Sequence, residues 1–206
     1  AIGYSSLANL TIGDSNTVIG YQAGDAMTTT ANTVLIGQSA GGSINNTGAD
    51  GTVAIGYQAL EDLTSGGSNT ALGYRAGMNM TTGGNNVAIG YNSLVNAVDT
   101  CNSNIAIGSQ AMITVDRGTN GSATVNGNIA IGYNALAGGD FVDQDKDLVG
   151  NIAIGKNALD ATAANAQTGT IAIGHEALTA LTSGNKNIAI GYEAGKAMTT
   201  GEGNVA

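Results

Sequence analysis

The sequence predicts a mainly β protein, built as a parallel β-solenoid of about twelve rungs with a repeat of 17 residues. One motif, seen at residues 86–91 as Asn-Val-Ala-Ile-Gly-Tyr, recurs along the chain, and such a period indicates a stacked repeat. β-Branched residues alternate within the motif, which favours a strand. The 33 glycines, one phenylalanine and no tryptophan imply a core made of small side chains.

The repeat is measured from the glycine that follows the apolar triplet. These glycines are spaced 17, 17, 19, 17, 17, 18, 24, 23, 19 and 17 residues apart. Longer spacings indicate insertions, and in solenoids insertions become surface loops. We therefore expect one repeat array over residues 1–206, a segment of a longer fibre, with inserted loops at about 114–126 and 138–150.

The apolar triplet predicts a short strand with two apolar faces. Ile precedes the glycine in almost every repeat, and a column of Ala lies between the β-branched positions. Strands that are apolar on both faces are typical of parallel sheets. We expect Val and Ile to point inward and the small Ala side chains to admit another layer or chain. The columns include Ile89, Ile107, Ile131, Ile154, Ala88, Ala106, Ala130 and Ala153.

Asn before each strand and Tyr after it predict two further columns. Asn suits a turn, and amides stacked at one rung spacing can bond to each other as a ladder, as expected for Asn86, Asn104, Asn128 and Asn151. All seven tyrosines follow the repeat glycine, which predicts stacked, partly solvated rings such as Tyr57, Tyr74 and Tyr91. His175 occupies the same position, and we interpret it as a substitution in this column.

The return segment leaves two conformations open. Ala59, Leu60 and Leu63 have helical spacing, with Gly66 where a helix cap would stand, yet an irregular second strand fits seven residues equally well. Where the Leu60 position holds glycine, Met follows three residues later, as in Gly77 and Met80. We expect this exchange to conserve core volume.

Composition excludes several classes of function. The net charge of −9 disfavours nucleic acid, because phosphate binding needs clustered Lys and Arg. No apolar run approaches the ~20 residues that span a bilayer, so we expect no membrane insertion. Cys101 is alone and cannot form an intrachain disulfide. No repeat position carries a recurring acid and the single His has no visible partner, so we expect neither an enzyme nor a cofactor.

Three alternating carboxylates in the second insertion, Asp143, Asp145 and Asp147, form a weak candidate for a Ca²⁺ site. Lys146 lies among them, and the glycine and distal glutamate of an EF-hand loop are missing. A solvated loop is the favoured interpretation.

The motifs at residues 86–90, 104–108 and 187–191 resemble the head repeat of trimeric autotransporter adhesins of the YadA type. The fuller unit at residues 69–77 is similar to shaft repeats of phage tail-fibre proteins. The resemblance covers essentially the whole chain. It implies a left-handed parallel β-roll in a trimeric fibre that contacts host surfaces. The 17-residue period exceeds the shorter adhesin repeat, and no membrane anchor or chaperone domain is visible here.

These observations predict a structural fibre shaft or adhesin stalk, extracellular or on a virion surface. Its expected partners are further copies of itself, as a homotrimer, and a host surface glycan or protein. The alternative is a secreted ligand-binding solenoid, with glycans on the Tyr column or ice on Thr pairs such as Thr81-Thr82.

Overall fold

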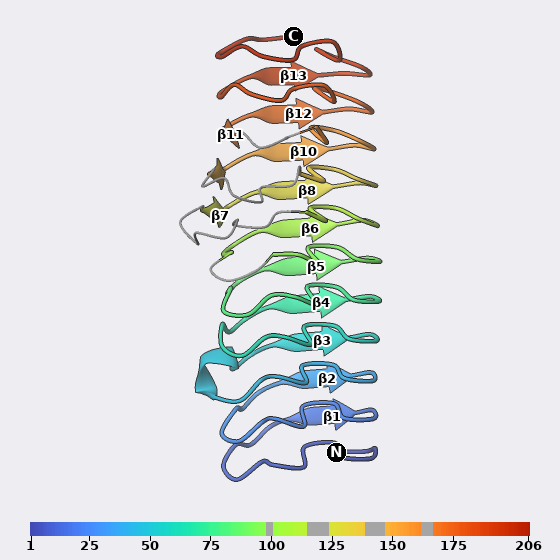
Figure 1. The fold of residues 1–206 in the computed structure, drawn as a ribbon, viewed down its shortest axis with the longest axis vertical. Coiled ribbons are helices and arrows are strands. Elements are labelled where there is room, and N and C mark those ends of the chain that lie inside the picture. Colours follow the sequence, from blue (N-terminus) through green and yellow to red (C-terminus); the bar gives the residue numbers. More distant parts are fainter. Residues whose placement is uncertain (98–100, 115–123, 139–146, 162–166) are drawn as a thin grey trace.

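The protein is a straight stack of rungs along one long axis (Figure 1). The computed structural model describes residues 1–97, 101–114, 124–138, 147–161 and 167–206. Within them, ten strands form one parallel sheet in chain order. They are β1 (Thr17–Ile19), β2 (Val34–Ile36), β3 (Val53–Ile55), β4 (Thr70–Leu72), β5 (Val87–Ile89), β6 (Ile105–Ile107), β8 (Ile129–Ile131), β10 (Ile152–Ile154), β12 (Ile171–Ile173) and β13 (Ile188–Ile190).

Each strand pairs with the equivalent strand of the neighbouring repeat. Ala88 lies opposite Ala106, and Ala106 lies opposite Ala130, so every position of the motif forms a column along the sheet. This confirms the predicted parallel β-solenoid. Single bridges extend the pairing beyond both outermost strands, from Ile2 to Ile19 and from Ile188 to Val205. The ten strands and these bridges are what the structure shows of the array, and twelve rungs remain a prediction.

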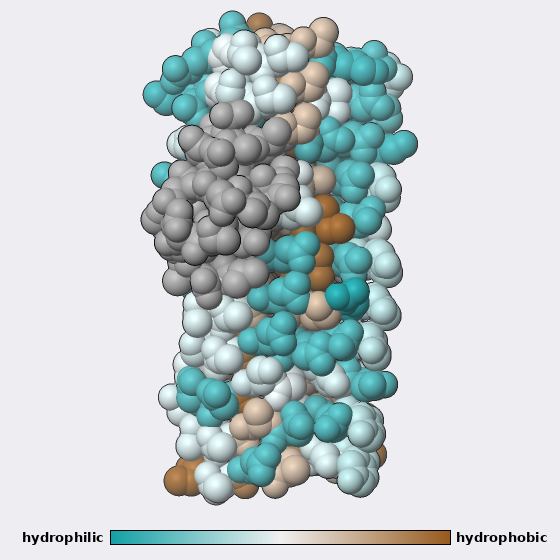
Figure 2. Space-filling view, in the orientation of Figure 1, coloured by the Kyte–Doolittle hydropathy of each residue, from teal (hydrophilic) through white to brown (hydrophobic). Residues whose placement is uncertain are grey.

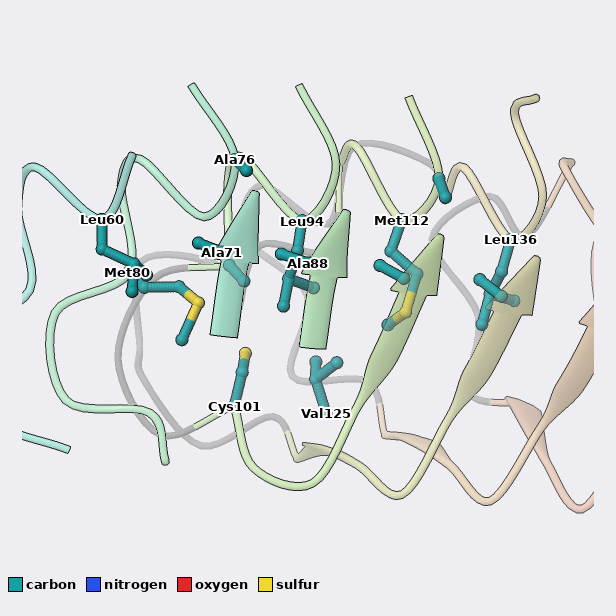
Figure 3. Packing of buried hydrophobic residues seen from close by; sticks show 14 of the residues in the cluster. Leu60, Ala71, Ala76, Met80, Ala88, Leu94, Cys101, Met112, Val125 and Leu136 are labelled. Carbon is teal, nitrogen blue, oxygen red and sulfur yellow. The ribbon is translucent and has the colours of Figure 1, made fainter. Parts of the chain in front are cut away.

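The predicted orientation of the strands is wrong. The Ala column points inward and is almost completely buried, from Ala54 at β3 to Ala189 at β13. The flanking Val and Ile residues point outward and are half-buried or exposed. Leu60, Leu94, Met112 and Leu136 enter the interior from the return segments, beside the strand alanines (Figure 3). These long side chains fill the narrow interior and leave room only for Ala on the strands beside them, whereas β1 and β2 carry the larger Val18 and Leu35 at the inward position.

The return segments are turns, not the helical turn that we considered at Ala59 to Leu63. Gln58 and Leu60 have φ of 53° and 50°, in the left-handed region that a right-handed helix excludes. Equivalent residues of the other repeats share this conformation. Among the described residues the only helical element is a 3₁₀ turn, η1 (Thr47–Ala49). Helical spacing was misleading here, because a turn with positive φ at alternate residues also buries Ala59, Leu60 and Leu63.

The exchange of Leu for Gly plus Met is confirmed as volume compensation. Met27 and Met80 are fully buried. A Cβ atom placed on Gly77 would lie 3.2 Å from the Met80 sulfur and 2.7 Å from a Leu60 methyl group. The methionine therefore fills the space that the missing side chain leaves. Glycine also suits this position because its φ is 60°, whereas leucine adopts the same conformation at some cost.

Glycine after each strand is required by the stacking of the rungs. Gly56 has φ of 139°, and a Cβ atom there would lie 2.2 Å from the carbonyl oxygen of Gly73 in the next rung. Only glycine combines this backbone conformation with so close an approach. The glycine column thus fixes where every strand ends.

The insertions contribute a second small sheet that the sequence did not predict. Its order is β11 (Gln167–Thr168), β9 (Leu148–Val149) and β7 (Val125–Asn126), all parallel. Val125 and Leu148 are buried in the same core as the main strands. The ends of both predicted loops, 114–126 and 138–150, are therefore part of the solenoid wall.

Candidate functional site: the outward strand face

The main sheet presents a long apolar surface, which we call the outward face. It consists of the first and third residues of the ten main strands, mostly Val and Ile. Its most exposed members include Ile190, at 61%, and Leu72, at 46%. Nine strand spacings of ~4.8 Å give it a length of ~43 Å. On monomeric proteins, contiguous apolar patches above a few hundred Å² usually mark interaction surfaces.

Polar groups border the outward face along its length. The Tyr column follows the strands, and the turn residues before the Asn column, such as Ser68 and Ser103, precede them. Figure 2 shows a face on which hydrophilic residues predominate and brown residues form separate groups. No continuous brown column is visible on that face. An apolar centre with polar borders is the usual anatomy of a protein interface.

The predicted Asn ladder is confirmed, and it lies inside the rod. Asn86, Asn104, Asn128 and Asn151 are buried, and each side-chain oxygen accepts from the backbone N–H of the next rung at 2.9–3.0 Å. Their Nδ2 groups donate both to the preceding amide oxygen and to a backbone carbonyl across the interior. A buried network satisfied in this way rigidifies the fold.

Threonine interrupts the ladder at Thr52 and Thr170. The hydroxyl oxygens of both are buried and have no hydrogen-bond partner among the described residues. A threonine side chain is too short to repeat the amide geometry, so no side-chain bond joins Thr170 to Asn187 in the described structure. The ladder is therefore divided into segments, and the segment from Asn69 to Thr170 is the longest that the structure describes.

A second column of acceptors lies at a neighbouring turn, and the sequence analysis missed it. In each case a side-chain oxygen accepts from a backbone N–H of the preceding rung at 2.8–2.9 Å. The acceptors are Asp50, Asn102, Asn126, Asp147 and Asn185. Four of them lie six residues before the repeat glycine, but most other repeats carry Gly, Ala, Val or Thr at that position, so the column is not evident from the sequence.

This second column also bears on the candidate Ca²⁺ site. Asp147 is exposed, and its Oδ1 accepts from the N–H of Thr124. Asp143 and Asp145 lie outside the described residues. Within the described part of the chain, no three His, Cys, Asp or Glu side chains are grouped as metal ligands. The hydrogen bond from Thr124 gives Asp147 a structural role in the turn that needs no metal ion.

The predicted Tyr stacking is confirmed. The rings of Tyr57 and Tyr74 are 5.1 Å apart between centroids, those of Tyr74 and Tyr91 are 5.4 Å apart, and the planes deviate by 12–14°. Tyr4 stacks on Tyr21 in the same way. The rings cover each other's faces and leave their edges in solvent. Sugars stack on ring faces, so the interior of this column offers them little.

His175 continues the aromatic column and belongs to a charged cluster. Its ring stacks on Tyr192 at 5.2 Å, and its Nε2 lies 3.8 Å from Glu176. Lys196 bridges Glu176 at 2.5 Å and Glu193 at 3.0 Å. Hydrogen bonding to Lys196 lowers the pKa of both glutamates, and the same bonds raise the pKa of Lys196. We interpret the cluster as an ion-pair network on the rod surface.

Several Thr hydroxyl groups are used in contacts between rungs. Thr11, Thr64 and Thr182 each donate their hydroxyl hydrogen to a backbone carbonyl of the next rung. These hydroxyls thus reinforce the stacking of the rungs. Of the Thr pairs predicted for ice binding, Thr28 donates its hydroxyl hydrogen in the same way, and the ice-binding alternative stays a prediction.

Comparison of the chain with protein-family models, with curated proteins and with solved structures finds no match. Across the described residues, no helix has the length and apolarity needed to cross a membrane. The resemblance of the repeat motif to adhesin and tail-fibre repeats therefore remains a resemblance.

Proposed function

We propose that this chain is the shaft or stalk subunit of a structural fibre that assembles as a homotrimer through its outward face. The single observation that carries the proposal is the long apolar outward face of the ten-stranded sheet, made mostly of Val and Ile. Exposed along ~43 Å, such a surface would cause aggregation unless a defined partner covered it.

The most suitable partner is a second and third copy of the same surface. The outward face is straight, repeats with the rung spacing, and carries apolar residues with borders of Tyr and turn residues. Identical faces meet in register around a symmetry axis, as homo-oligomers require. The number three rests on the resemblance to trimeric adhesin and tail-fibre repeats. A fibre of this kind acts outside the cell or on a virion surface.

The mass of the intact assembly tests the proposal. Native mass spectrometry should give about 61 kDa, three times the 20.2 kDa of one chain. A dimer of about 40 kDa would retain the outward face as an interface but overturn the trimer. A monomer at micromolar concentration would overturn both.

Charged substitutions locate the interface. Ile107→Lys places an ammonium group in the middle of the outward face, and we expect it to dissociate the assembly. Thr82→Lys adds the same charge to an exposed loop and should leave the mass unchanged. Equal effects of the two variants would contradict an interface on the outward face.

A further inference from the structure

The tyrosines of three neighbouring rungs form a column of stacked phenol rings on the surface of the rod. The centroids of Tyr57, Tyr74 and Tyr91 are separated by 5.1 and 5.4 Å. Their side chains are 38%, 45% and 52% exposed, so the outer ring edges, which carry the hydroxyl groups, are open to small oxidants.

The backbone holds these rings in register. The carbonyl oxygen of Tyr57 accepts from the N–H of Arg75 at 2.9 Å, and that of Tyr74 accepts from Asn92 at 3.0 Å. The carbonyl of Tyr91 accepts from Gln110 at 2.9 Å. Each tyrosine is therefore fixed one rung from the next. Such positioning favours reaction between neighbours over reaction between molecules.

We propose that the Tyr57–Tyr74–Tyr91 stack is a site of oxidative covalent cross-linking between rungs. The co-reactant is hydrogen peroxide acting with a haem peroxidase. The product is dityrosine, a carbon–carbon bond between the ortho carbons of two adjacent rings. This reactivity is independent of the number of chains in the assembly.

The reaction balances without any further reagent. The peroxidase removes one electron and the phenolic proton from each of two tyrosines and reduces one hydrogen peroxide to two water molecules. The two phenoxyl radicals join at their ortho carbons, and the ring hydrogens at those carbons move to the oxygens. Each cross-link therefore lowers the mass of the chain by two hydrogen atoms.

The chain contains its own negative control. Tyr133 belongs to the same column, but Ser109 and Lys156 occupy the neighbouring positions. Tyr133 is 47% exposed, close to the exposure of Tyr74, so oxidants reach both equally. If adjacency governs the reaction, Tyr74 should couple within the chain and Tyr133 should not.

The positions of the basic residues allow a direct readout. Trypsin cleaves after Arg75 and Arg117, which separates Tyr74 from Tyr91 and Tyr91 from Tyr133. Dilute protein is oxidised, and material that migrates as a single chain on a denaturing gel is digested. We expect peptide 1–75 to remain joined to peptide 76–117, and peptide 118–146 to be released. Cross-linking only between chains, or equal joining of peptide 118–146, would overturn the proposal.

Two variants sharpen the test. Tyr74→Phe keeps an aromatic ring in the stack but removes the phenol, so the joined peptide should disappear. Total intrachain dityrosine should fall only to roughly half, because Tyr4 and Tyr21 remain stacked. Ser109→Tyr fills the gap, and peptide 76–117 should then become joined to peptide 118–146. Tyr133→Phe is the matched control and should leave the joined peptide of the unaltered stack unchanged. A joined peptide that persists in Tyr74→Phe would contradict coupling between neighbours.

Discussion

The middle residue of each main strand and most of the residues on either side of it are apolar. The middle residue is buried, whereas the residues beside it face outward. Ala106 is completely buried, whereas Ile105 and Ile107 beside it face outward. The smaller side chain lies inside because Leu94 and Met112 of the return segments already fill the interior. The large apolar residues outside this filled interior are the reason for the proposal that other chains cover the outward face.

This comparison separates the stability of one chain from the stability of the assembly. Inward substitutions should change the unfolding of a single chain at any protein concentration. Outward substitutions should act through the assembly and depend on concentration, because association stabilises by mass action.

The largest effect is expected from an inward overpacking change. Ala106→Ile places three further carbon atoms in a filled interior and should destabilise the fold by about 3 kcal/mol. Urea unfolding followed by circular dichroism measures this loss, which should be equal at low and high protein concentration. A loss below about 0.5 kcal/mol, the usual range of surface substitutions, would show that the interior is not full.

The next effect concerns the buried amide ladder. Asn104→Ala removes a donor to the Val125 carbonyl and an acceptor for the Asn128 N–H. Unpaired buried groups cost about 2 kcal/mol. Urea unfolding should show this loss, together with faster amide exchange at Asn128. Thr82→Ala, at an exposed turn residue without a positive φ, is the control and should change stability far less.

A smaller effect on the single chain is expected from a substitution on the outward face. Ile107→Thr keeps the β-branched shape and should cost a monomer less than about 0.5 kcal/mol. In the assembly it should weaken association, so the urea midpoint should fall most at high protein concentration. A shift independent of concentration would assign Ile107 to the core of one chain.

The smallest effect is expected at the surface ion pairs. The pKa values of Glu176 and Glu193 lie below their ordinary 4.5, so their stabilisation is present above that value. It is lost as pH falls through the lowered pKa values. Lys196→Met should therefore be slightly less stable than the unaltered chain at pH 7 and equal to it near pH 3. A difference that persists in acid would indicate lost packing instead of lost charge.

Sequence periodicity predicted the columns well but not their direction. The Asn and Tyr ladders and the Gly77–Met80 exchange were correctly inferred, because each depends on position within the repeat. The orientation of Ala88 and Ile89 was wrong, because a strand that is apolar on both faces gives no signal of which face is inside. The turn at Gln58 and Leu60 was missed, since neither residue type usually has positive φ. Acceptors such as Asp50 and Asn102 were missed, because most other repeats carry a residue without a side-chain amide or carboxylate at the same position.

The threonine interruptions have a mechanical consequence. Backbone hydrogen bonds between rungs run along the rod, so tension applied to its ends would open rungs one after another. Between Asn69 and Thr170 the amide ladder adds a second line of bonds in the same direction. Where the rungs of Thr52 and Thr170 meet the rungs that follow them, these amide hydrogen bonds are missing in the described structure. Under load the rod should yield first at these two places, and the segment between them should separate as one block.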